Sequence, residues 1–118
     1  MAERRRLDRM ESQMSVELDA VITSLEDPRI ELVSVTDVDL AKDMRHARVY
    51  VSGLGADTDR EAILQGLNSA KAFIRRQLSS RMPHLQRTPD LTFDYDESIE
   101  RGMRIEKLLE QLHDEQEQ

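Results

Sequence analysis

The hydrophobic residues of this chain change their spacing several times, from the period of a helix to the period of a strand and back. Steps of three and four residues place side chains on one face of a helix, and they predict helical stretches over residues 7–25, 58–82 and 98–112. Residues rich in β-branched side chains or alternating with a period of two predict strands over residues 30–40, 46–52 and 91–96. With a bend in the middle helical stretch, the order is helix–strand–strand–helix–helix–strand–helix. This order predicts an α+β domain with a three-stranded sheet and helices on one face.

The first two predicted strands are close together in the sequence. In the first, apolar residues stand at the odd positions 33 and 35 and then at the even positions 38 and 40, a switch that predicts a β-bulge or a bend. The second strand alternates without interruption and turns Ala47, Val49 and Val51 to the core. Because only the short polar link 41–44 separates the two strands, we expect them to form an antiparallel pair.

The middle helical stretch carries signals for its start, its bend and its end. Thr58-Asp59-Arg60-Glu61 has the form of a capping box, so we expect the helix to start at Thr58. Small and poorly helical residues over 66–72 predict the bend, and Pro83 predicts the end. The apolar stripe of this stretch consists of Ile63, Leu67, Ala70, Ile74 and Leu78.

The net charge of −7, from 17 basic and 24 acidic residues, would ordinarily count against a nucleic-acid partner. The charges are unevenly distributed, however. Residues 10–45 contain nine acidic and three basic residues, whereas residues 62–93 contain five basic residues and one acid. A second basic cluster consists of Arg4, Arg5, Arg6 and Arg9. A nucleic-acid partner therefore stays open.

Composition excludes several classes of site. The chain has no cysteine, which excludes disulfides, a thiol nucleophile and cysteine-ligated zinc or iron–sulfur centres. No apolar run approaches the roughly 20 residues that a membrane span needs. No apolar segment follows the basic residues 1–6, as a secretory signal would require. We expect a soluble, cytoplasmic protein.

Five segments of the chain, taken in order, resemble one known family. They are Asp27-Pro28-Arg29-Ile30 and residues 35–40, 45–52, 67–76 and 91–98. The order of elements is similar to the type II KH fold, αββααβ, here with an additional C-terminal helix. The five segments are similar to those of ribosome-binding factor A, and the resemblance runs from about residue 3 to residue 110.

The resemblance implies a non-enzymatic factor that binds the free small (30S) ribosomal subunit late in its assembly. It implies 16S rRNA as the binding partner and help in the maturation of that RNA, including the processing of its 5′ end. It also implies a role in growth in the cold, contact with other assembly factors, and no cofactor. We expect a monomer, with one KH-like domain over residues 1–110 and an acidic, flexible tail over residues 111–118.

The family also implies a kink between the two central helices. Its members lack the GxxG loop of ordinary KH domains and carry an Ala-x-Gly interruption instead. Here the corresponding residues are Ala70, Lys71 and Ala72, so an alanine replaces the glycine. Because alanine favours helix over glycine by roughly 1 kcal/mol, we expect a shallower kink.

The candidate RNA-binding residues are basic or polar. The resemblance places the basic segment 62–93 at the nucleic-acid face of a KH-like fold, where a row of cations would follow phosphates. The outward face of the second strand adds cations beside Tyr50, and the basic N-terminus offers an arm. The candidates are Arg4, Arg5, Arg45, His46, Arg48, Asn68, Ser69, Lys71, Arg75, Arg76, Arg81 and Arg87.

Each of these features also has a purely structural interpretation. The basic helix face would balance the acids of residues 10–45, the strand face would be an ordinary exposed sheet surface, and the N-terminal arginines would solubilise the first helix. The alternative function is then a protein-interaction module that docks a basic partner through its acidic helix, residues 10–25, and its acidic tail.

The acidic and aromatic residues do not indicate a metal or catalytic site. The sequence has no EF-hand spacing, no HExxH and no Gly-x-Ser-x-Gly. Polar strand faces and a helix N-terminus explain Asp37, Asp39, Asp94, Asp96 and Glu97. Aromatic residues make up 3% of the chain, so we expect them to fill the core rather than to stack on bases.

Overall fold

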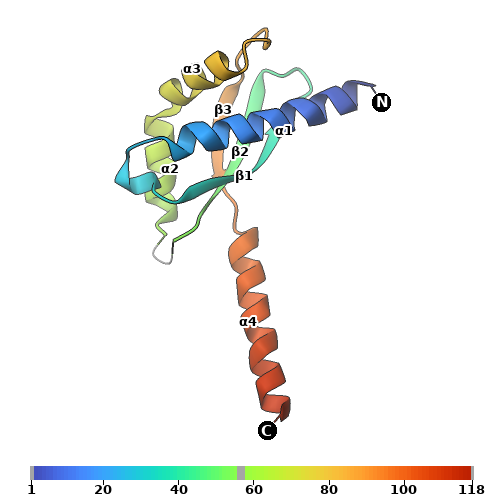
Figure 1. The fold of residues 1–118 in the computed structure, drawn as a ribbon, viewed down its shortest axis with the longest axis vertical. Helices are drawn as coiled ribbons and strands as arrows, with labels where there is room; N and C mark the ends of the chain where they lie inside the picture. The colour runs from blue at the N-terminus through green and yellow to red at the C-terminus, as the bar shows by residue number, and fades with distance from the viewer. Residues whose placement is uncertain (1, 56–57, 118) are drawn as a thin grey trace.

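A three-stranded sheet, in the order β1-β2-β3, forms the centre of the structure (Figure 1). The computed structural model describes residues 2–55 and 58–117. The α+β order that the hydrophobic periods predict is confirmed. The elements are α1 (Ala2–Thr23), the short 3-10 helix η1 (Pro28–Ile30), β1 (Val33–Leu40), β2 (His46–Gly53), α2 (Arg60–Ser69), α3 (Lys71–Arg81), β3 (Asp90–Tyr95) and α4 (Ser98–Glu117).

The strand pairing combines both directions. β1 and β2 are antiparallel, as their short link predicts, whereas β2 and β3 are parallel. The parallel pair follows from the connection, because α2 and α3 carry the chain back along the sheet before β3 begins. The predicted bulge lies at Thr36, since Val35 pairs with Val51 and Asp37 pairs with Tyr50.

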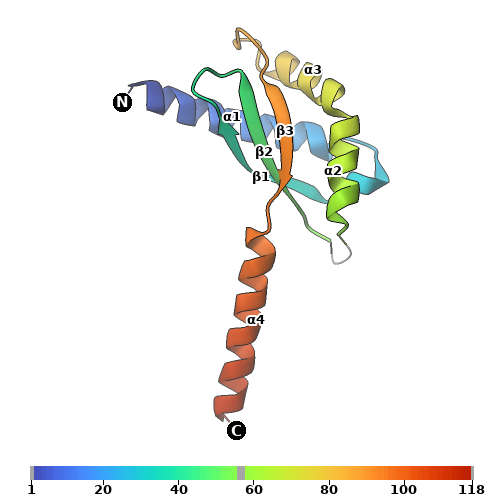
Figure 2. The same cartoon turned by 180° about the vertical axis from the view of Figure 1, so that it is seen from behind.

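The core lies between one face of the sheet and the first three helices. α1 crosses this face in front of β1, and it lies behind the strands when the molecule is turned by 180° (Figures 1 and 2). α2 and α3 lie on the β3 side. The core is formed by Met14, Leu18, Val21, Ile22, Ala47, Val49, Val51, Ile63, Leu67, Ile74, Leu78, Leu91 and Phe93, with a few further side chains. Each large aliphatic side chain contributes about 1.5–3 kcal/mol by leaving water, so this layer holds the helices on the sheet.

Carboxylates cap backbone N–H groups along β1, one of the two edge strands of the sheet. The N–H of Leu40 donates to Oε2 of Glu11 at 3.0 Å, and the N–H of Val35 donates to Oδ1 of Asp19 at 2.9 Å. Between them, the N–H of Val38 donates to Oδ1 of Asp37 at 2.9 Å. Glu11 and Asp19 belong to α1, so these bonds also fix α1 alongside the strand.

The first residues of α1 and α2 differ from the predicted ones. α2 begins at Arg60 rather than at Thr58, because the carboxylate of Asp59 accepts from the N–H of Ala62 at 3.2 Å and makes Asp59 the N-cap. Aspartate caps at least as well as threonine, so the predicted N-cap is wrong by one residue and the predicted start of the helix is wrong by two. α1 extends back beyond Leu7 to Ala2, since arginine is a good helix former.

Two further details concern the bend and the aromatic residues. α2 and α3 meet at Ala70, whose φ and ψ of −92° and 2° leave the helical region for one residue. The N–H of Ala70 still donates to the carbonyl of Gly66 at 3.1 Å, so the joint interrupts few hydrogen bonds. The expectation that the aromatic residues fill the core is confirmed for Phe93 but is wrong for Phe73, which is 40% exposed on α3.

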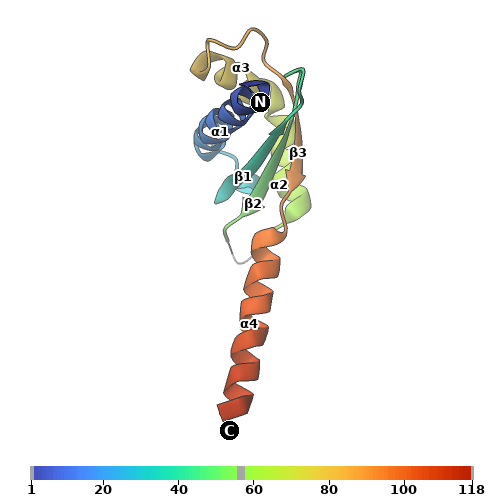
Figure 3. The ribbon, with the colours of Figure 1, turned by 90° about the vertical axis from the view of Figure 1, so that its right-hand side faces the viewer.

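α4 projects away from the rest of the molecule (Figure 3). The radius of gyration is 17.2 Å, against about 13.5 Å for a compact chain of this length. The helix passes through Glu110, where we expect the folded domain to end, and continues to Glu117. The flexibility of residues 111–118 stays a prediction. Within the described residues, no helix is long and apolar enough to cross a membrane.

Candidate nucleic-acid interface

Segments that carry basic residues lie toward the end of the molecule opposite the tip of α4. The start of α1, the β1–β2 turn, α3 and the segment 82–89 all lie at this end (Figures 1 and 3). The N–H of Asp90 donates to the carbonyl of Arg45 at 2.9 Å, which ties the β1–β2 turn to the start of β3. We refer to this end as the basic end and define it by five residues: Arg4, Arg5, Arg45, Arg76 and Arg87.

The side chains of these five arginines are exposed. In the described part of the chain, none of the five guanidinium groups has a hydrogen-bond or ion-pair partner. A guanidinium group offers five N–H donors in a planar fork that fits phosphate oxygens. The basic end can therefore hold a phosphate backbone without first breaking an internal contact.

The side chain of Arg75, another candidate, forms hydrogen bonds within the protein. Its Nε donates to the carbonyl of Pro89 at 3.1 Å, and its Nη2 donates to the carbonyl of Thr88 at 3.0 Å. The same Nη2 lies 3.4 Å from Oδ1 of Asp90. Arg75 thus holds the segment that precedes β3 against α3.

Two other candidates on α3, Arg81 and Lys71, also contact other side chains of the protein. For Asn68 and Ser69 on α2, no such contact is found within the described residues. Nη1 of Arg81 lies 3.2 Å from Oε2 of Glu17, which joins α3 to α1. Nζ of Lys71 lies 5.9 Å from the centre of the Phe93 ring, a cation–π contact. Asn68 and Ser69 are exposed in the last turn of α2, beside the joint at Ala70.

The outward face of the sheet carries its cations next to carboxylates. Nη1 of Arg48 lies 2.7 Å from Oδ2 of Asp94 on β3. His46 is within hydrogen-bond distance of Thr92, with 3.0 Å between Nε2 and Oγ1, and Tyr50 is half-buried. Asp39 is exposed on the neighbouring strand β1. This face is therefore less suited to phosphate than the basic end.

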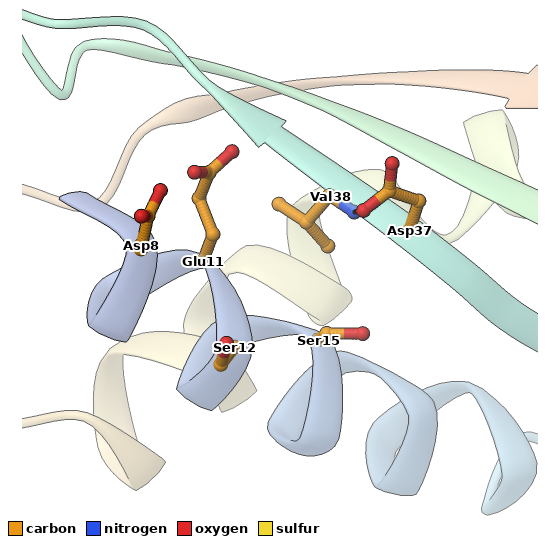
Figure 4. A pocket seen from close by; sticks show the side chains of 6 residues that line it. All are labelled: Asp8, Glu11, Ser12, Ser15, Asp37 and Val38. Atoms are coloured by element: carbon orange, nitrogen blue, oxygen red, sulfur yellow. Dashed lines mark hydrogen bonds between the residues drawn. The ribbon is translucent and has the colours of Figure 1, made fainter. Parts of the chain in front are cut away.

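An acidic hollow borders the basic end. It has a volume of about 490 Å³ and lies open between α1 and β1 (Figure 4). Its lining residues are Asp8, Glu11, Ser12, Ser15, Asp37 and Val38. Its carboxylates would repel phosphate, so they limit how far an RNA backbone could extend along α1. Across residues 2–55 and 58–117, no three His, Asp or Glu side chains are placed to hold a metal ion.

A second polar cluster lies where β3 passes into α4. Oδ2 of Asp96 accepts from the Thr36 hydroxyl at 2.6 Å, and Oδ1 accepts from the N–H of Ser98 at 2.9 Å. The hydrogen bond from Thr36, followed by those from Ser98, holds the pKa of the Asp96 carboxyl below its usual range. This cluster joins the start of α4 to β1.

The neighbouring Glu97 strengthens the same junction. Its carboxylate forms ion pairs with Arg60 of α2 and Arg101 of α4. The hydrogen bond from Arg101, together with the charge of Arg60, lowers the pKa of Glu97. The guanidinium of Arg60 also lies over the Tyr95 ring, 5.0 Å from its centre.

Comparison with known proteins identifies the family. The model of the family described as ribosome-binding factor A matches residues 6–109. The chain belongs to the ribosome-binding factor A family. The resemblance of the five sequence segments is thereby confirmed, and so is the KH-like fold that it implies.

Individual members of the ribosome-binding factor A family agree with this assignment. Ribosome-binding factor A of Staphylococcus epidermidis is 41% identical over 109 residues, which cover 92% of this chain and 93% of that protein. The crystal structure of ribosome-binding factor A from Thermus thermophilus has a TM-score of 0.70 at 31% identity, over 75% of this chain and 93% of that one. A homology model of the Thermus thermophilus factor, fitted into the cryo-EM map of a 30S complex, has a TM-score of 0.64 at 32% identity, over the same shares of the two chains.

The structure adds Lys42 to the cations that the sequence indicates. Lys42 is exposed in the β1–β2 turn, close in sequence to Arg45, and has no side-chain partner in the described part of the chain. Lys42 lies within residues 10–45, where acidic residues outnumber basic ones, so the net charge of that segment does not reveal an exposed lysine. The polar link between two adjacent strands was the signal that could have revealed it, because such a link becomes an exposed turn.

Proposed function

We propose that this chain binds the free small ribosomal subunit late in its assembly, through the basic end, and assists the maturation of 16S rRNA, including the processing of its 5′ end. The observation that carries the proposal is that five exposed arginines from four separate segments, none with a partner in the described residues, belong to elements at one end of a chain whose net charge is −7. Family membership supports it, as does the relative that was fitted into a 30S complex.

The mechanism is binding without catalysis. The free guanidinium groups would neutralise phosphates, and the shape of the basic end would decide which arrangement of the RNA fits. A protein shifts an equilibrium between two RNA conformers only by binding one of them better. The chain would therefore favour the mature conformer at the site where it docks and leave cleavage of the RNA to a nuclease.

The direct test is sedimentation with purified free small subunits over a salt series. The double substitution Arg76→Glu and Arg87→Glu should weaken binding at least tenfold and reduce the slope of log affinity against log salt, because two phosphate contacts are lost. The matched control is Arg104→Glu with Lys107→Glu on α4, which changes the net charge equally at the opposite end. Equal losses in both variants, or no loss in either, would contradict the proposed interface.

The role in rRNA maturation has its own test. Depletion of the protein should lead to 16S rRNA that retains extra nucleotides at its 5′ end, measured by primer extension, with a larger effect in the cold. Wild-type protein supplied in trans should restore the mature end, and the Arg76→Glu, Arg87→Glu variant should not. A normal 5′ end after depletion would contradict this part of the proposal.

A further inference from the structure

The ring of Phe73 is exposed in the first turn of α3, the helix that also carries Arg76. The next residue, Ile74, is fully buried, so the turn of the helix directs Phe73 away from the centre of the core. Phenylalanine is a poorer helix former than alanine, leucine or arginine, and its ring makes no hydrogen bond that would favour exposure to water. Neither helix formation nor hydration therefore accounts for an aromatic ring at this position.

The other aromatic residues of the chain are in use within the domain. The chain has two phenylalanines, two tyrosines and no tryptophan, and the structure describes all four aromatic residues. Phe93 and Tyr95 each lie beneath a basic side chain, and Tyr50 is half-buried in the sheet. For Phe73, no cation lies over the ring within the described residues. Phe73 is thus the aromatic residue that offers a free ring face to a ligand.

The charge around this ring is positive. Arg76 follows Phe73 by three residues, which places the two side chains next to each other on the helix surface. Arg76 is exposed and has no partner in the described part of the chain. The segment 62–89 contains no aspartate or glutamate, and Glu17, which reaches α3 from α1, is paired with Arg81. The surroundings of Phe73 therefore attract a group that carries negative charge.

The neighbouring side chains favour a flat ligand over an apolar groove of a protein. A helix that binds such a groove presents several apolar side chains at helical spacing, whereas the residues around Phe73 at that spacing include Ser69, Arg76 and Gln77. Ser69 and Ala72 are exposed and small, so they leave room beside the ring. A nucleotide combines a flat base with a negative phosphate. In a duplex, however, the faces of the bases are covered by their neighbours, so only an unpaired base can stack on the ring.

We propose that Phe73 stacks on an unpaired base of the RNA that is bound at the basic end, while Arg76 contacts a neighbouring phosphate. This inference rests on the proposed function and adds to it the class of RNA, which is a single-stranded loop, bulge or end. Every base has a face that can stack on an aromatic ring. Phe73 would therefore favour unpaired RNA over duplex and would select little for sequence.

Ultraviolet crosslinking of the full chain to purified free small subunits tests the contact directly. Short-wavelength irradiation joins an aromatic side chain to a base that is stacked on it. Trypsin cuts after Lys71 and Arg75, so the peptide of residues 72–75 should carry a ribonucleotide, which mass spectrometry identifies. A peptide without a ribonucleotide, or one that is joined to a ribosomal protein, would overturn the inference.

Substitutions of Phe73 separate this inference from the proposed function. Phe73→Leu should lower the affinity for free small subunits about tenfold, with the salt slope unchanged, because leucine is apolar but offers no flat ring and Arg76 is kept. Phe73→Tyr keeps the ring and should bind like the wild type. The control Leu54→Ala changes a residue that is exposed beyond the other end of β2, and it should also leave the affinity unchanged.

The outcomes of this series are distinct. If Phe73→Leu binds like the wild type, or if Phe73→Tyr binds as weakly as Phe73→Leu, the inference about the ring is wrong and the proposed function stands. If the wild-type chain does not bind free small subunits, the proposed function itself is wrong. Equal melting temperatures of the wild type and Phe73→Leu, followed by circular dichroism, show that a loss of affinity comes from the ring and not from the fold.

Discussion

The basic end and α4 are both exposed surfaces at opposite ends of one small protein, yet they are made in different ways. The basic end is assembled by the fold, because its arginines come from α1, the β1–β2 turn, α3 and the segment 82–89. The exposed apolar stripe of α4 lies on one face of a single helix and consists of Ile105, Leu108, Leu109 and Leu112. An assembled surface is lost when the core is lost, whereas a surface on one helix depends on that helix and its anchor. We therefore expect the two surfaces to respond differently to the same kinds of change.

The largest difference should appear in the stability of the domain. Ile74 of α3 is fully buried in the core, and Ile74→Ala should lower the free energy of unfolding by about 2–5 kcal/mol, through lost burial and the cavity that remains. Leu108→Ala on α4 removes an apolar side chain of similar size that is 59% exposed, and it should change the stability by less than about 0.5 kcal/mol. Urea unfolding followed by circular dichroism measures both. Equal destabilisation would show that α4 packs on the domain in solution.

A smaller difference separates two neighbouring arginines of α3. Arg75→Ala should lower the free energy of unfolding by about 1–2 kcal/mol, because the carbonyls of Thr88 and Pro89 lose a charged donor. Arg76→Ala should be nearly neutral for stability but should reduce the salt slope of subunit binding by about one. Thermal unfolding and sedimentation, applied to both variants, test this exchange of roles. A destabilised Arg76→Ala variant would contradict the assignment of Arg76 to the free surface.

The smallest effect concerns acid sensitivity at the base of α4. The pKa of Asp96 is lowered in the folded protein by the hydrogen bond from Thr36 and by those from Ser98. Its stabilising contribution is therefore complete above the pKa of the unfolded chain, which is about 3.9, and is lost as the pH falls through the lower folded value. Asp96→Asn should flatten the decrease in stability below about pH 4.

Asp39→Asn provides the matched control for acid sensitivity. Asp39 is exposed on β1, and its carboxylate has no partner in the described part of the chain. The acid limb of its stability curve should follow that of the wild type. The same limb for Asp96→Asn and Asp39→Asn would contradict the assignment of this acid sensitivity to the carboxylate of Asp96.

Local regularities made much of the fold predictable. Ala47, Val49 and Val51 alternate with polar residues because a strand turns successive side chains to opposite faces, and the structure buries all three. The change of parity between Val35 and Val38 likewise predicted a bulge or a bend between these residues, and the structure has a bulge at Thr36. Such patterns depend on the backbone period alone, so a single sequence contains them.

Features that depend on partners distant in the sequence were not predictable from pattern. Charge and spacing place Arg75 and Arg76 in the same class, and only the segment before β3 distinguishes them by occupying Arg75. Nothing in the period of Ile105, Leu108 and Leu109 shows whether a helix face meets its own domain or solvent. The N-cap of α2 was missed for a related reason, since Thr58 and Asp59 are both good caps and the geometry of the preceding turn decides between them.

The carboxylates along β1 have a consequence for the behaviour of the protein at high concentration. An edge strand with unpaired N–H groups is a template on which a strand of another molecule can add, and repeated addition leads to aggregates. Here Glu11, Asp19 and Asp37 occupy the N–H groups of Leu40, Val35 and Val38. Three of the acids that make the chain acidic overall thus protect the β1 edge of the sheet, and they help to keep further strands from adding there.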